Sequence, residues 1–74
     1  MANFIVHKAT GWLPDGRRIT CEDWPSQGLA IDALAKSREW IWAYHDVDAL
    51  ADVIMAELNV DPARPYGCSI LVEE

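Results

Sequence analysis

Residues 46–59 read DVDALADVIMAELN, and this stretch specifies one element of the fold more clearly than any other part of the chain. Its apolar side chains recur every three and four residues, which places them on one stripe of an α-helix. Asp46 is suited to cap the start of this helix and Asn59 its end, before Asp61 and Pro62 prevent continuation. The stripe consists of Val47, Leu50, Ala51, Ile54, Met55 and Leu58. A helix of this kind needs a second apolar layer to cover the stripe.

The segment directly before this helix, residues 40–45, reads WIWAYH. Its aromatic and alternating character predicts a strand with two apolar faces, one carrying Trp40, Trp42 and Tyr44. Further upstream, an apolar run over residues 29–35 predicts a helix of about ten residues. Asp23 or Ser26 is suited to cap that helix. Residues 37–39, Ser-Arg-Glu, are expected to break it.

The N-terminal part of the chain has the pattern of a β-hairpin. Residues 3–9 are β-branched and aromatic enough for a strand, and residues 17–22 predict the returning strand, with Ile19 and Cys21 on one face. Between them, residues 13–17 read LPDGR, in which Pro presets φ and Gly supplies the positive φ of a bulge-type turn. Residues 66–73 predict a last strand.

Together these elements predict an α+β fold with the order β-β-α-β-α-β. Two helices against one face of a small, mostly antiparallel sheet would bury both apolar stripes, which makes a two-layer sandwich. The chain has 74 residues, too few for two hydrophobic cores, so we expect residues 1–74 to form a single domain. The hydrophobic fraction of 51% and charged fraction of 24% are typical of a folded globular protein.

Charge is distributed unevenly along the chain, whose net value is −6. Residues 1–38 carry five basic and four acidic side chains, whereas residues 39–74 carry one basic and eight acidic side chains. Binding to nucleic acid depends on Lys and Arg that displace counterions, so we expect no direct nucleic-acid partner. An acidic surface instead favours a basic protein surface, although acidity also serves solubility alone.

The cellular setting follows from what the sequence lacks. No apolar run approaches the roughly 20 residues of a membrane span, and the N-terminal residues show no secretory signal. We therefore expect a cytoplasmic protein without a membrane partner, in which Cys21 and Cys68 are reduced thiols. A disulfide between the two cysteines stays open as an alternative.

Residues for catalysis or metal binding are not arranged in a recognisable pattern. His7, His45, Cys21 and Cys68 contain no close His or Cys pair, so we expect no metal site. His45 and Asp46 are neighbours, but adjacent residues on a strand point to opposite faces and do not form a dyad. No nucleophile elbow, phosphate-binding loop or dinucleotide fingerprint is present. We expect a protein that is not an enzyme and has no cofactor.

Two groups of residues are candidates for binding a partner. The first is acidic: no Lys or Arg occurs between Arg38 and Arg64, so the helix over 46–59 would present a uniformly acidic strip. The second is aromatic, because Trp and Tyr are enriched at binding hot spots when they are exposed. The alternative is that the aromatic residues form the core. The candidate residues are Asp46, Asp48, Asp52, Glu57, Asp61, Trp12, Trp40, Trp42 and Tyr44.

These features predict a small, acidic, non-enzymatic interaction module that binds and inhibits or modulates a larger protein with a basic or complementary groove. In size and charge it resembles, in kind only, the small inhibitors that bacteriophages use against host machinery, including mimics of nucleic acid. Such a protein would act in the host cytoplasm. One alternative is a homo-oligomeric small-molecule-binding or regulatory module, for which a homodimer is expected. Another alternative is an immunity or antitoxin-type protein.

Overall fold

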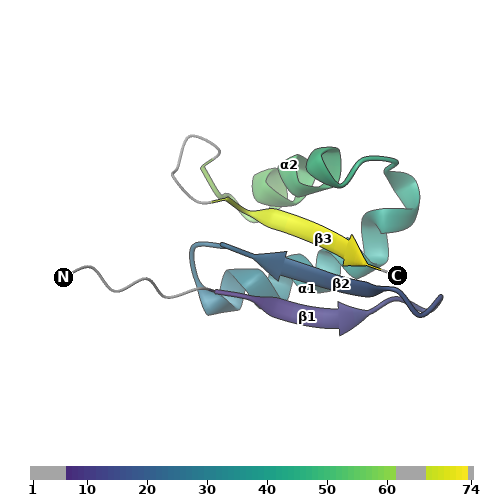
Figure 1. Ribbon diagram of the computed structural model, residues 1–74. Helices are drawn as coiled ribbons and strands as arrows, with labels where there is room; N and C mark the ends of the chain where they lie inside the picture. Colours follow the sequence, from purple (N-terminus) through teal and green to yellow (C-terminus); the bar gives the residue numbers. More distant parts are fainter. Residues whose placement is uncertain (1–6, 62–66, 74) are drawn as a thin grey trace.

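The computed structural model describes residues 7–61 and 67–73, which form a three-stranded antiparallel sheet and two α-helices. The elements are β1 (Ala9–Trp12), β2 (Arg18–Glu22), α1 (Gln27–Trp40), a 3₁₀ turn η1 (Ile41–Ala43), α2 (Val47–Glu57) and β3 (Ser69–Glu73). Apart from η1, the order is therefore β-β-α-α-β, and the predicted strand between the two helices is wrong. In the sheet β2 lies in the middle, with β1 and β3 at its edges (Figure 1).

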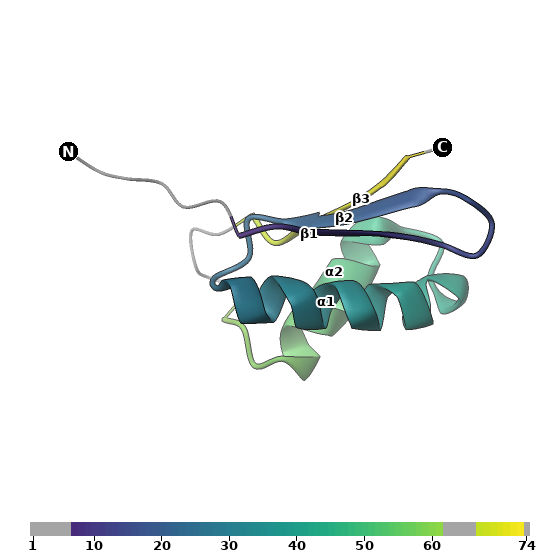
Figure 2. The same ribbon diagram turned by 90° about the horizontal axis from the view of Figure 1, so that it is seen from below.

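The two helices lie on the same face of the sheet, as the sequence predicted (Figure 2). α1 packs on β1 and β2, and α2 packs on β3 and on α1. Ile19 and Cys21 of β2 point toward the helices and are fully buried. The opposite face of the sheet has no second layer among the described residues. The fold is thus a two-layer α+β sandwich whose core lies between one sheet face and two helices.

The hairpin between β1 and β2 forms as predicted. The Leu13 amide donates to the Arg17 carbonyl over 2.8 Å, and the Gly16 amide donates to the Leu13 carbonyl over 2.9 Å. Gly16 has φ +94°, which is why glycine is needed there. The Asp15 carboxylate accepts from the Arg17 backbone amide over 3.0 Å, and this bond lowers the pKa of Asp15. The turn thereby sets the register that places Gly11 opposite Ile19.

The first strand lies later in the chain than expected. We predicted a strand over residues 3–9, of which residues 3–6 lie outside the described residues, and β1 begins only at Ala9. The register set by the turn pairs Ala9 with Cys21, so Asp23 is the position that would pair beyond it. Asp23 has φ +62°, which ends β2. The position of the turn, more than local strand propensity, therefore determines where β1 lies in the chain.

Helix α1 is longer than the sequence predicted, because residues 37–39 do not interrupt it. Ser26 caps its start, with its hydroxyl accepting from the Leu29 amide over 3.1 Å. Ser37 is fully buried, and its hydroxyl donates to the Leu34 carbonyl over 2.9 Å. A serine that bonds back to its own helix satisfies its polar group internally. Ser37 therefore occupies a core position of α1 and does not end it.

Residues 40–45 do not form a strand. Trp40 ends α1, residues 41–43 make the 3₁₀ turn η1, and Tyr44 follows in extended conformation. Trp40, Ile41 and Tyr44 are partly buried against the core, whereas Trp42 is exposed. The three aromatic residues therefore do not share one face. The β-propensity of a side chain reflects how well it fits a half-buried surface. Trp40 and Tyr44 occupy such half-buried positions at the end of α1 and in the connection to α2, so no strand is needed.

Helix α2 matches its prediction closely. The Asp46 carboxylate accepts from the Asp48 amide over 2.9 Å, and Asn59 with φ +57° follows the helix end. Leu50, Ala51 and Ile54 are buried, and the other stripe residues are partly buried. The last strand, β3, starts at Ser69 instead of residue 66, which lies outside the described residues. Cys68 precedes β3 with φ +46°, so the extended backbone begins only after it.

Candidate partner-binding surface

The five predicted acidic residues do not form one strip. Asp48 and Asp52 are exposed on α2, and neither takes part in an ion pair within the described part of the chain. Glu57 is exposed too, but its carboxylate lies 4.0 Å from the Lys36 ammonium of α1. Asp46 is engaged in capping α2. Asp61 is exposed in the segment after the helix.

The helical geometry explains this separation. At about 100° per residue, Asp48 and Asp52 lie about 40° apart around α2, whereas Glu57 lies about 140° from Asp52. Glu57 therefore faces the flank next to α1, and Asp48 and Asp52 share the other flank with Met55. A local acidic surface is therefore made by Asp48 and Asp52, and we call these two residues the acidic flank.

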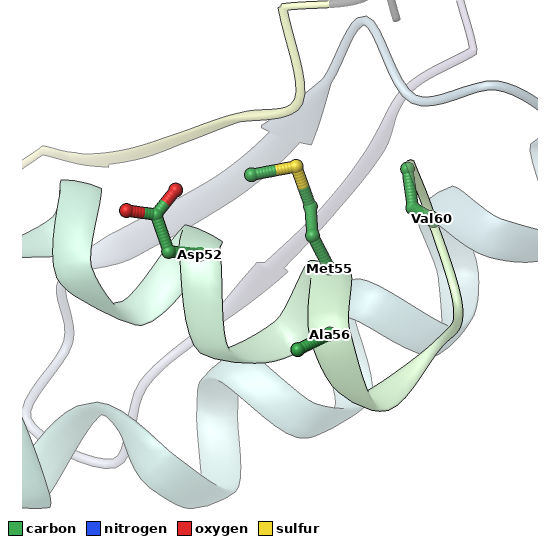
Figure 3. Close-up of a pocket in the computed structure, with 4 residues that line it drawn as sticks. All are labelled: Asp52, Met55, Ala56 and Val60. Carbon is green, nitrogen blue, oxygen red and sulfur yellow. The ribbon is translucent and has the colours of Figure 1, made fainter. Parts of the chain in front are cut away.

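A shallow pocket of about 310 Å³ opens beside the acidic flank. It is lined by Asp52, Met55 and Ala56 of α2 and by Val60, which follows the helix (Figure 3). Three of these side chains are apolar, and Asp52 adds the one carboxylate. A second, smaller pocket of about 210 Å³ shares Val60. Its other lining residues are Pro25, Leu29, Asn59 and Asp61.

The four predicted aromatic anchors separate into two exposed and two partly buried side chains. Trp12 is 60% exposed and Trp42 is 58% exposed, whereas Trp40 and Tyr44 pack against the core. Trp12 lies on β1, on the uncovered sheet face, because it pairs with Arg18, the neighbour of inward-facing Ile19. Trp42 lies on η1. The alternatives of core and exposed patch are therefore both realised, at different residues.

Basic side chains lie against Trp40 and Trp42, although no Lys or Arg occurs between Arg38 and Arg64 in the sequence. The Arg17 guanidinium carbon is 5.7 Å from the centroid of the Trp42 ring. The Lys36 ammonium is 5.0 Å from the centroid of the Trp40 ring. Both distances are within the range of cation–π attraction. The spacing in sequence is 25 residues for the first pair, so no local pattern could have revealed it.

The groups considered for catalysis or metal binding are not brought together. Cys21 and Cys68 are both buried free thiols, and burial raises the pKa of each. A buried, protonated thiol is a poor nucleophile. Across residues 7–61 and 67–73, no three His, Cys, Asp or Glu side chains are placed to hold a metal ion.

The sequence interpretation missed the pocket at Asp52. Met55 belongs to the predicted apolar stripe, yet it is only partly buried and lines the pocket wall. The available signal was the position of Met55, which lies at the edge of the apolar stripe next to Asp52.

Comparison of the chain with protein-family models, with curated proteins and with solved structures finds no match. No helix in the described part of the chain is long and apolar enough to cross a membrane.

Proposed function

We propose that this protein is a small, acidic, non-enzymatic interaction module that binds a larger protein through a basic surface of that partner and thereby inhibits or modulates it. The observation that carries the proposal is the pocket beside the acidic flank, which combines three apolar side chains with the carboxylate of Asp52. This combination suits a Lys or Arg side chain of the partner.

The chemistry of such a side chain matches the pocket in two respects. Its aliphatic stem would contact Met55, Ala56 and Val60, because Lys and Arg bury their methylene groups along apolar surface. Its charged end would reach the Asp52 carboxylate at the rim. Asp48, one turn before Asp52, adds a second negative charge on the same flank and supports attraction over a longer distance.

Trp42 is the aromatic anchor we assign to the same function. Its ring is exposed, although the Arg17 guanidinium lies within cation–π distance of it. An exposed tryptophan is the kind of side chain that contributes most at protein interfaces. Trp40 and Tyr44 are partly buried against the core, and we assign them no direct contact with the partner.

We test this function by capturing partners from a cytosolic lysate at low salt and then measuring binding of the purified partner. The double variant Asp48→Lys/Asp52→Lys should slow association by about 10-fold or more, because exposed charges act mainly on the association rate. Added salt should weaken the wild-type complex for the same reason.

The matched control is Asp32→Lys/Glu39→Lys, which makes the same charge change on exposed positions of α1. This variant should bind nearly as wild type does. If both double variants weaken binding equally, the effect comes from net charge alone. If the α2 variant does not weaken binding, the acidic flank does not contact the partner. Trp42→Ala should raise the dissociation rate, and an unchanged rate would remove the aromatic anchor.

A further inference from the structure

Among the residues that the structure describes, no strand pairs with the outer edge of β1, which carries backbone groups that the sheet does not use. In antiparallel pairs the residues alternate between bonding to the neighbouring strand and pointing away from it. The Leu13–Arg17 bond closes the hairpin, so Gly11 and Ala9 bond to β2. The amide and carbonyl groups of Thr10 and Trp12 consequently point outward, away from β2.

Two large apolar side chains flank this edge, one on each face of the sheet. Trp12 lies on the uncovered sheet face, and Ile31 of α1 is 54% exposed. Ile31 belongs to a helical row with Leu34 and Arg38, since the spacings are three and four residues. A Cβ at Gly11 would lie 3.4 Å from the Leu34 side chain and 3.5 Å from that of Arg38. The row therefore runs along β1.

The usable edge is bounded at both ends. The Lys8 amide donates to the Gln27 side-chain oxygen over 3.3 Å, and the Gln27 side-chain nitrogen donates to the Lys8 carbonyl over 2.8 Å. Gln27 thus occupies the position that an added strand would take at Lys8. Beyond Trp12, Pro14 has no amide hydrogen to offer. The open run comprises residues 10–12.

We propose that a second copy of this chain pairs its β1 antiparallel with this edge, about a two-fold axis at Gly11. Thr10 then lies opposite Trp12 of the second copy, and the outward groups of both residues form hydrogen bonds across the axis. The two Gly11 residues form the pair that lacks hydrogen bonds, which has the closest Cα approach, about 4.5 Å. Pro14 falls opposite Lys8, whose amide and carbonyl Gln27 already satisfies.

The distribution of charge favours a second copy at this edge. A chain with net charge −6 repels itself, so association requires that the acidic regions stay apart. The acidic flank lies on α2, which packs on β3 at the other edge of the sheet. The β1 side instead carries Lys8, directly before β1, and Arg38 of α1, whose side chain lies next to Gly11. Pairing through β1 places the two acidic flanks at the far ends of the dimer.

The same arrangement covers the two exposed apolar side chains beside β1, Trp12 and Ile31. Trp12 lies over Thr10 of the second copy on the uncovered face. On the opposite face the two α1 helices run antiparallel, which brings the aliphatic stem of Arg38 toward Ile31 of the second copy while its guanidinium stays in water. The interface therefore consists of the β1 edge and the neighbouring flank of α1 from each copy. Both are needed, because the area buried by the strand pair alone is small compared with that of a stable interface.

Sedimentation equilibrium of the full chain tests this proposal, from about 1 µM to about 1 mM protein. The mass should rise from the 8.3 kDa monomer to the dimer with increasing concentration. Trp12→Lys and Ile31→Glu should each raise the dimer dissociation constant at least 10-fold. Thr10→Pro should do the same, because the amide it removes points outward. Circular dichroism establishes that each variant is folded.

The matched control is Leu71→Lys, since Leu71 is 43% exposed on the same uncovered face but lies on β3. It should leave the dissociation constant unchanged. A protein that stays monomeric at every concentration overturns the proposal. A dimer that Leu71→Lys disrupts, while Trp12→Lys and Ile31→Glu do not, also overturns it and assigns the contact to the open face. The variant Asp48→Lys/Asp52→Lys should keep the dimer, which separates this proposal from the proposed function.

A cysteine at the axis gives an independent measurement. Gly11→Cys should form an intermolecular disulfide on mild oxidation, because the expected Cα separation is within the range that a disulfide spans. Ala49→Cys, on the exposed face of α2, should not. The native Cys21 and Cys68 are buried and do not interfere. Equal cross-linking of both variants would contradict the two-fold axis at Gly11.

Discussion

The two helices cover the same sheet face but do so with different side chains. α2 buries Leu50 and Ile54 together with Ala51, whereas α1 buries only Ala30, Ala33 and Ser37. The buried positions of α1, which packs on β1 and β2, therefore hold small side chains. A helix that is buried through small residues has a weak periodic signal, which is why α1 was harder to delimit from the sequence than α2.

Their outer surfaces differ as well. The outer surface of α2 carries Asp48 and Asp52 beside a pocket, whereas the β1 flank of α1 carries Ile31 and Arg38. The protein, whose net charge is −6, therefore has an acidic flank on α2 and an apolar and basic flank where α1 lies along β1. This difference is the basis for assigning a basic partner to one side and a second copy of the chain to the other.

The largest expected effect concerns the buried face of α2. Leu50→Ala and Ile54→Ala should each lower the free energy of unfolding by about 2–5 kcal/mol, because both side chains are fully buried and truncation leaves a cavity. Urea denaturation measures the effect. Met55→Ala, in the same helix but at a partly buried position, should cost less, and an equal cost would contradict the described packing.

A smaller effect tests the burial of small residues on α1. Ala33→Leu should lower the free energy of unfolding by about 1–3 kcal/mol, since Ala33 is fully buried and a larger side chain would overpack the core there. The same substitution at Ala49, on the exposed face of α2, should change stability by about 0.5 kcal/mol or less. If α1 accepts leucine at residue 33 without loss, the contrast between the helices is wrong.

The caps should show that the helices are equivalent at their starts. Ser26→Ala and Asp46→Ala each remove a side-chain acceptor for a backbone amide and should cost about 1 kcal/mol. Asp46→Asn keeps the cap and removes the charge, so it should retain most of the stability. A full loss with asparagine would show that charge, and not hydrogen bonding, is the main contribution of Asp46.

The smallest effect is expected where the two helices meet at the surface. Lys36 and Glu57 are 4.0 Å apart and both partly exposed, so the coupling measured by a double-mutant cycle should be about 0.5 kcal/mol or less. Lys36→Gln, Glu57→Gln and the double variant complete the cycle. A coupling of several times that value would mean that the ion pair contributes to the docking of α1 on α2.

Local patterns allowed two parts of the fold to be predicted well. The hairpin turn followed from Pro14, Asp15 and Gly16, because each of these residues restricts or permits particular backbone angles by itself. Helix α2 followed from a cap and a periodic stripe that both lie within one stretch of chain. The strand predictions were less successful for residues 7–8 and 40–45, since strand propensity needs a neighbouring strand to be realised.

The candidate site was predicted in composition but not in geometry. The acidic residues on α2 are exposed as expected, but the direction of Glu57 toward Lys36 depends on how α1 packs beside α2. The pocket at Asp52 depends on the chain turning back after Asn59 so that Val60 faces the helix. Similarly, the contact of Arg17 with Trp42 joins residues that are distant in sequence.

The sequence by itself determined the α+β class, the tight turn, the capped helix α2 and the concentration of acidic residues in the second half of the chain. The structural features depend on backbone restrictions or periodicity within a few neighbouring residues, and the concentration of acidic residues is a property of the composition. Only the tertiary structure decided that residues 40–45 connect two helices, which tryptophans are exposed, and that β1 is an open edge. These features depend on which surfaces meet when the apolar stripes are buried together, and this is a property of the whole chain.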